Sequence, residues 1–228
     1  MKSQRQKEYL EKTFRNYPEL ESLRVPVCDA AKLLVRCYRA DGQVMTYGNG
    51  GSAADSEHIV GELMKGFLKK RPLSAEQKAR IAATGLTKKP DGFELTLQQG
   101  LRAISLVSQS SLLTAFSNDV DPDMVFAQQV FTYGRLGDVL IALSTSGNSK
   151  NVVNAAIAAR AAGVKIIAFT GERERDLSRI SEITLRVPSA ETHRIQEYHL
   201  PLYHVLCALV EEVFFGELEM QNEKTIGN

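Results

Sequence analysis

Residues 139–170, VLIALSTSGNSKNVVNAAIAARAAGVKIIAFT, carry the pattern that decides the fold. Val139–Leu143 is an uninterrupted apolar run, which is typical of a parallel strand buried on both faces. After a polar loop we expect a helix over Asn151–Ala162, ended by Gly163, and a second apolar strand over Val164–Thr170. A strand, a helix and a strand in this order predict a right-handed crossover in a parallel sheet.

The same alternation extends over the rest of the chain. Strands are expected over 43–47, 102–107 and 183–187, and helices over 5–15, 27–40, 52–67, 110–117, 123–133 and about 191–215. The pattern predicts one α/β domain with helices on both faces of the sheet. Residues 1–42 hold the N-terminal helices, and residues 69–99 form an insertion or flap with a short helix capped by Ser74. Residues 217–228 are expected to be a polar tail.

Composition narrows the class of protein. The 228 residues are 43% hydrophobic and 24% charged, which is typical of a globular chain, and the net charge of +1 gives no general attraction to nucleic acid or to anionic membranes. No apolar run is long enough to span a bilayer, and the polar N-terminus does not predict a signal peptide. Cys28, Cys37 and Cys207 contain no CxxC pair, so we expect reduced thiols and a cytoplasmic protein.

A glycine-rich turn, Gly48–Ser52, lies between a predicted strand and a predicted helix. Glycines let backbone amides approach an anion, and a helix N-terminus favours negative charge. The turn lacks the Lys-Ser/Thr ending of a P-loop and the glycine spacing of a dinucleotide-binding motif. A plain tight turn with Ser52 as the helix N-cap is the alternative.

A second polar loop, Ser144–Ser149, follows the apolar strand and precedes a helix. Its hydroxyls and amides converge at the carboxyl end of a strand, where open α/β sheets bind ligands. This loop suits a phosphate monoester. The alternative is a hydroxyl-rich cap in which Ser149 is only the N-cap of the helix.

Four further side chains suit metal binding or proton transfer. His58 and Glu62 are four residues apart and share a helix face, and Gln196 and His204 lie about two turns apart on the last helix. Their nitrogen and oxygen atoms are suitable ligands for Zn²⁺, and the same groups serve as a general base and a general acid. Taken separately, each pair is also compatible with ordinary solvated surface, and Pro201 is expected to kink the helix between Gln196 and His204.

Three segments, GNGGSAADSEH, STSGNS and RIQEYHLPLYHVLCALVE, together resemble the sugar isomerase (SIS) domain family, in its phosphoheptose isomerase branch. The resemblance implies a five-stranded parallel sheet flanked by helices and a homotetramer with sites shared between subunits. It also implies an aldose–ketose isomerase that converts sedoheptulose 7-phosphate to D-glycero-D-manno-heptose 7-phosphate through an enediol.

The resemblance also assigns roles to residues. It implies that Glu62 and His204 are the base and the acid, and that a suspected zinc ion is held by His58, Glu62, Gln196 and His204. The substrate is contacted by Asn49, Gly50, Gly51, Ser52, Asn118, Asp119, Ser144, Thr145, Ser146, Ser149 and Gln196. Near Gly66, where the family carries an arginine, Lys65 is the nearest positive charge.

Two other functions remain open at this stage. A non-catalytic SIS module would bind a sugar phosphate or a protein partner, and another SIS enzyme would act on a different sugar phosphate. A binding module needs the phosphate loop but no acid, base or metal ligands. The presence of His58, Glu62, Gln196 and His204 therefore favours the isomerase.

Overall fold

The computed structural model describes residues 3–85 and 96–226, with side-chain positions up to residue 216. Its centre is a five-stranded, wholly parallel sheet in the order β2-β1-β3-β4-β5. The strands are β1 Val44–Tyr47, β2 Ala103–Ser105, β3 Val139–Ser144, β4 Lys165–Thr170 and β5 Ile183–Arg186. The predicted fold class is therefore confirmed.

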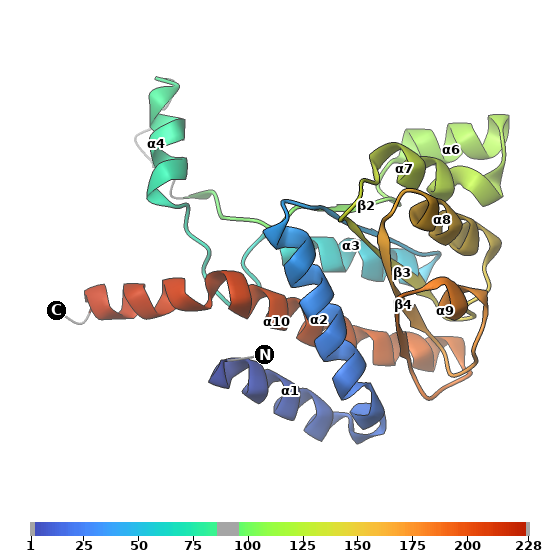
Figure 1. Cartoon of the computed structure of the whole chain (residues 1–228), viewed down its shortest axis with the longest axis horizontal. Helices are drawn as coiled ribbons and strands as arrows, with labels where there is room; N and C mark the ends of the chain where they lie inside the picture. Colours follow the sequence, from blue (N-terminus) through green and yellow to red (C-terminus); the bar gives the residue numbers. More distant parts are fainter. Residues whose placement is uncertain (1–2, 86–95, 227–228) are drawn as a thin grey trace.

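Helices cover both faces of this sheet (Figure 1). The α-helices are α1 Gln4–Asn16, α2 Arg24–Arg39, α3 Gly51–Met64, α4 Ala75–Ala83, α6 Ser110–Asp119, α7 Val125–Tyr133, α8 Lys150–Ala161, α9 Asp176–Ile180 and α10 Thr192–Ile226. Two 3-10 turns, η1 Pro18–Leu23 and η2 Pro122–Met124, precede α2 and α7. No described helix is long and apolar enough to cross a membrane.

The two faces of the sheet build two cores. Val139, Ile141 and Leu143 of β3 point into a core shared with α1, α2, α3 and α10. Leu140 and Ala142, at the alternate positions, point into a core shared with α7, α8 and α9. Alternate residues of a strand face opposite sides. The uninterrupted apolar run is therefore required because both faces of β3 are covered.

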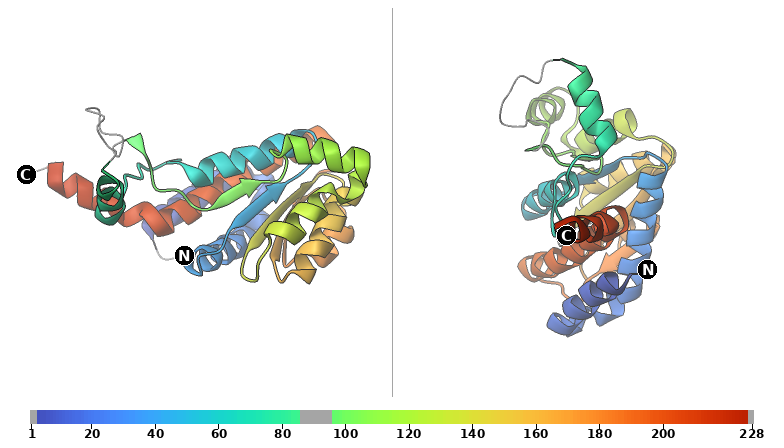
Figure 2. Two further views of the ribbon diagram at one scale, coloured as in Figure 1. Left: turned by 90° about the horizontal axis from the view of Figure 1, so that it is seen from above. Right: turned by 90° about the vertical axis from the view of Figure 1, so that its left-hand side faces the viewer.

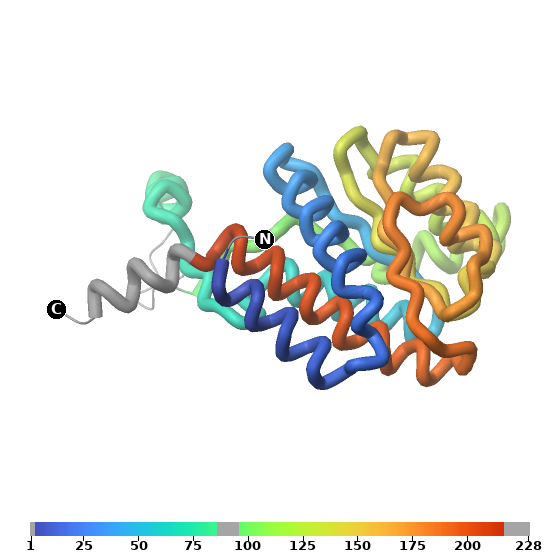
Figure 3. The backbone as a smooth tube through the Cα atoms, turned by 60° about the horizontal axis from the view of Figure 1, so that its bottom comes forward, coloured from blue at the N-terminus to red at the C-terminus, as the bar shows by residue number. Residues whose placement is uncertain are grey.

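The last helix, α10, packs against three other helices, α1, α2 and α3. In the tube view α1 lies alongside α10, and the two helices pack against each other (Figure 3). Helix α10 runs to Ile226, beyond the end predicted at about residue 215, so the polar tail is helical as far as Ile226. The segment ELEMQNEK is rich in good helix formers, and its polarity does not prevent it from continuing a helix.

Helix α3 ends at Met64, three residues before the predicted end at Phe67. The chain turns there because the carboxylate of Glu211 on α10 accepts hydrogen bonds from the backbone amides of Phe67 and Leu68, at 2.9 and 2.8 Å. These bonds replace the helical ones. Helix α4, which follows, stands away from the sheet (Figure 2). Its predicted cap is confirmed, since Ser74 and Gln77 form a capping box; residues 86–95 of the predicted flap lie outside the described residues.

A buried histidine on α10 should make stability depend on pH. His199 is fully buried, and burial lowers its pKa to about 4. The unfolded chain binds a proton near the ordinary pKa of about 6.5, so the free energy of unfolding should fall by about 3 kcal/mol as the pH drops from 7 to 4. Urea unfolding of wild type and His199→Gln at both pH values checks this: the loss specific to wild type should disappear in the variant. Equal pH dependence in both proteins would contradict it.

Candidate active site

The phosphate-loop serines gather at the carboxyl end of β3. The hydroxyl oxygens of Ser144, Ser146 and Ser149 form a triangle with 3.4 Å between each pair. Ser149 is the N-cap of α8 by position, but its hydroxyl makes no capping hydrogen bond. The cap alternative is therefore wrong as an account of this hydroxyl, which faces the other two serines at a helix N-terminus, a favourable place for an anion.

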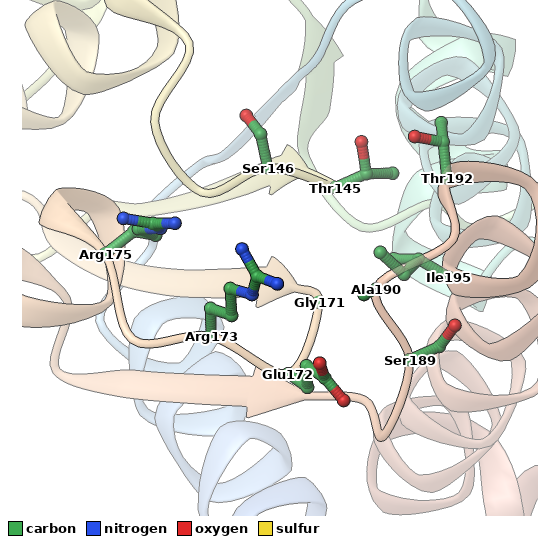
Figure 4. A pocket seen from close by; sticks show the side chains of 10 residues that line it. All are labelled: Thr145, Ser146, Gly171, Glu172, Arg173, Arg175, Ser189, Ala190, Thr192 and Ile195. Carbon is green, nitrogen blue, oxygen red and sulfur yellow. The ribbon is translucent and has the colours of Figure 1, made fainter.

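A cavity of about 260 Å³ opens beside this loop. Thr145 and Ser146 border it on one side, and Arg173 and Arg175 on the other (Figure 4). Neither guanidinium forms an ion pair with any residue the structure describes, so both are available to a ligand. The sequence prediction missed both arginines. The signal was present, because the run GERER directly follows β4 at the same edge of the sheet.

The glycine-rich turn packs closely against helix α10. Gly50, with a φ of 55°, is the N-cap of α3, so Ser52 is not the cap; it is buried in the first turn of that helix. A Cβ on Gly51 would lie 2.5 Å from the side-chain nitrogen of Gln196, which shows that α10 brings Gln196 against this turn. Asn49 reaches towards the phosphate loop and exchanges two hydrogen bonds with Asn151 of α8, at 2.9 and 3.0 Å.

His58, Glu62 and His204 meet where α3 packs on α10. His58 Nε2 lies 3.2 Å from Glu62 Oε1, and the His58 and His204 rings are 5.0 Å apart, edge to face. Partial burial and the neighbouring His58 lower the pKa of His204, while Glu62 opposes that shift. His204 is therefore a neutral imidazole at neutral pH. One of its ring nitrogens can then accept a proton or bind a metal ion.

The two oxygens of Glu62 have different surroundings. Oε1 faces His58, whereas Oε2 is buried and has no hydrogen-bond partner. The Lys65 ammonium lies 3.5 Å from Oε2 but is mostly exposed. The neighbouring Gly66 has no room for a side chain, because a Cβ there would collide with the carbonyl oxygen of Lys69. Lys65 is thus the positive charge beside Glu62.

The fit to zinc is partial. The 3.2 Å between His58 Nε2 and Glu62 Oε1 is close to the separation of about 3.4 Å between two ligands of a tetrahedral zinc with bonds of about 2.1 Å. Among residues 3–85 and 96–216, however, no three His, Cys, Asp or Glu side chains are grouped as an ion site. The Gln196 side chain lies against Gly51 of the glycine turn. His58 and Glu62 therefore fit one edge of such a site, and the full set of four ligands stays a prediction.

Asn118 and Asp119 are the two candidates on helix α6. They stand exposed at the end of α6, where the Asn118 amide donates to Asp119 Oδ1 at 2.8 Å. Within the described part of the chain, no hydrogen bond or ion pair links either residue to the two loops or to the α3–α10 cluster. Their predicted contact with substrate stays a prediction.

The chain is similar to known proteins in sequence and in fold. The SIS domain profile matches residues 8–85 and 79–171. The phosphoheptose isomerase of Sulfurimonas denitrificans is 34% identical over 92% of this chain and 96% of its own length. That of Rhodospirillum rubrum is 39% identical over 82% and 85%, respectively. The structure of phosphoheptose isomerase from Neisseria gonorrhoeae, 34% identical, aligns with a TM-score of 0.68 over 88% of this chain and 94% of its own.

The parallel sheet and its two loops thus define an α/β protein of the sugar-phosphate-binding class. More narrowly, the chain belongs to the SIS domain family, in its phosphoheptose isomerase branch. The resemblance seen in the three sequence segments is confirmed.

Proposed function

We propose that this protein is an aldose–ketose isomerase that converts sedoheptulose 7-phosphate to D-glycero-D-manno-heptose 7-phosphate. The observation that carries the proposal is the meeting of Glu62, His58 and His204 between α3 and α10, in a chain that also builds the serine triangle. The relatives named phosphoheptose isomerase support it. A module that only binds sugar phosphates has no use for this acid–base cluster.

The reaction moves a proton between neighbouring carbons through an enediol. Glu62 takes the proton from one carbon and returns it to the next, through a carboxylate whose Oε1 faces His58 and whose Oε2 lies 3.5 Å from the Lys65 ammonium. His204, kept neutral by its lowered pKa, exchanges protons with the substrate oxygens. The serine triangle and the two arginines hold the phosphate end, with charge-assisted hydrogen bonds from Arg173 and Arg175.

A zinc ion is part of the proposal. His58 and Glu62 would hold it, with His204 and Gln196 as the further ligands implied by the family. When bound, zinc supplies a Lewis acid that polarises the carbonyl and stabilises the enediolate. The 3.2 Å pair of donor atoms on His58 and Glu62 is the support for this part of the proposal.

The family also supports a homotetramer with shared sites, which light scattering of the purified protein would test. A cavity of about 350 Å³, lined by Tyr9, Phe67 and His204 among others, opens beside the α3–α10 cluster, where a partner could cover it. We place the enzyme in the cytoplasm. The free cysteines support this, because Cys28, Cys37 and Cys207 form no disulfide, as is usual in a reducing compartment.

The direct test is isomerisation of sedoheptulose 7-phosphate by the purified protein, after chelation and again after adding Zn²⁺. Turnover that returns with zinc supports both the reaction and the metal. Turnover that survives chelation supports the reaction and contradicts the metal. A folded protein that binds the sugar phosphate but does not convert it under either condition would contradict the isomerase and favour a binding module.

The phosphate loop gives a separate prediction. Ser146→Ala removes one corner of the serine triangle, so we expect KM to rise about tenfold, because a hydrogen bond to a charged group contributes about 1.5–3 kcal/mol. The turnover number should change little, since the phosphate does not react. Steady-state kinetics check this, with Thr132→Ala on α7 as a control for loss of an exposed hydroxyl. An unchanged KM would remove Ser146 from the phosphate site.

A further inference from the structure

A chain of hydrogen bonds lies behind His58, whose other ring nitrogen faces Glu62. The hydroxyl of Tyr203, on α10, donates to Asp55 Oδ1 at 3.1 Å and lies 3.0 Å from His58 Nδ1. Asp55, His58 and Glu62 all belong to α3, and their spacings of three and four residues place them on one face. Tyr203 is 1% exposed, and its ring packs against His58 and His204.

The number of protons fixes the direction of each bond. The Tyr203 hydroxyl has one hydrogen, and a carboxylate can only accept, so this hydrogen goes to Asp55. The contact of 3.0 Å between Tyr203 and His58 Nδ1 then needs its proton from the imidazole. The reverse arrangement would place two oxygens without a proton 3.1 Å apart and would lose a charge-assisted hydrogen bond.

This direction determines what His58 presents to Glu62. With the proton on Nδ1, the neutral ring carries its lone pair on Nε2, which lies 3.2 Å from Glu62 Oε1. Two electron-donating atoms at this distance repel each other unless a proton or a cation lies between them. His58 Nε2 and Glu62 Oε1 therefore form an electron-rich position that favours binding of a cation.

We propose that Tyr203, oriented by Asp55, is a positioning residue that fixes His58 in the Nδ1–H tautomer and so prepares His58 Nε2 and Glu62 Oε1 to share a divalent cation. Metal-binding histidines commonly donate their second N–H to such a partner, and loss of the partner typically lowers affinity or activity by about 10–100-fold. The tautomer does not depend on the proposed isomerase function; only its effect on turnover rests on that function.

The first experiment reads the tautomer directly. The chain has four histidines, so long-range ¹H–¹⁵N spectra of the chelator-treated protein can be assigned, using His58→Gln to identify the signals of His58. At about pH 8.5 an ordinary histidine is neutral. We expect His58 to carry its proton on Nδ1 in wild type and to shift towards Nε2 in Tyr203→Phe. A wild-type His58 protonated on Nε2 would overturn the proposal, whatever the variants do.

The second experiment measures Zn²⁺ affinity by competition with a chromophoric chelator. Tyr203→Phe keeps the ring and removes the hydroxyl, so we expect a 10–100-fold weaker affinity, and a fall in kcat with little change in KM for the sugar phosphate. Tyr198→Phe is the matched control, because that tyrosine lies on the same helix and its hydroxyl contacts Arg194 instead. Equal zinc affinity in wild type and Tyr203→Phe would overturn the role in metal binding. If wild type shows no turnover, the isomerase proposal fails, while the spectra still decide this one.

Discussion

Glu62→Gln is expected to lower kcat for sedoheptulose 7-phosphate by about 10³-fold, within the range of about 10²–10⁴ that general acid–base catalysis contributes. The glutamine amide has the shape of the carboxylate but cannot take a proton from carbon. Glu62 is only 8% exposed, and its carboxylate lies between His58 and Lys65, at 3.2 and 3.5 Å, so the amide takes the same place without the basicity of the carboxylate. Steady-state kinetics on the folded variant measure the loss.

A measurement of sugar-phosphate binding distinguishes loss of the catalytic base from loss of the binding site. The phosphate loop, the arginines and the glycine turn are untouched by Glu62→Gln, so calorimetry should show sugar-phosphate affinity close to that of wild type. Glu57→Gln is the control, since Glu57 lies on the same helix, is exposed and contacts Ser108. Full activity of Glu62→Gln would remove Glu62 from the mechanism.

Local patterns were sufficient to predict most of the fold. The apolar runs of β3 and β4 lie in the middle of the sheet and are buried on both faces, so their composition alone identifies them. Helix ends were less predictable where distant residues decide them. Glu211 ends α3 by binding the amides of Phe67 and Leu68, from 143 and 144 residues further along the chain, and no local signal reports that contact.

In the candidate site too, contacts within one loop could be predicted from the sequence, whereas contacts between distant segments could not. The serine triangle follows from one loop after one strand, so its convergence could be predicted from sequence spacing. Asp55 and Tyr203 are 148 residues apart, and their contact depends on how α3 packs on α10. The same packing sets the position of Gln196 against Gly51. Contacts that depend only on tertiary packing leave no local signal in a single sequence, so they could not be predicted from it.

Arg71→Met is expected to cost about 3–5 kcal/mol of the free energy of unfolding, the range for breaking a buried ion pair. The side chains of Arg71 and Glu211 are each 1% exposed and lie 2.8 Å apart. The same guanidinium donates to the carbonyl oxygens of Leu63 and Glu62, at 2.7 and 3.0 Å, and stacks on Phe215. Methionine fills much of the volume but satisfies none of these acceptors, and it leaves the Glu211 charge buried without its partner.

Thermal and urea unfolding measure this loss, which should lower Tm by roughly 10 °C for a chain of this size. Arg80→Met is the matched control: Arg80 and Glu76 form an exposed pair at 3.8 Å, so no measurable change is expected. Because Arg71 holds the carbonyl of Glu62 itself, activity should also fall at temperatures where the variant is still folded, through kcat more than KM. A variant as stable and as active as wild type would show that the last turn of α3, and with it the position of the Glu62 carboxylate, is fixed by the packing of α3 on α10 rather than by Arg71.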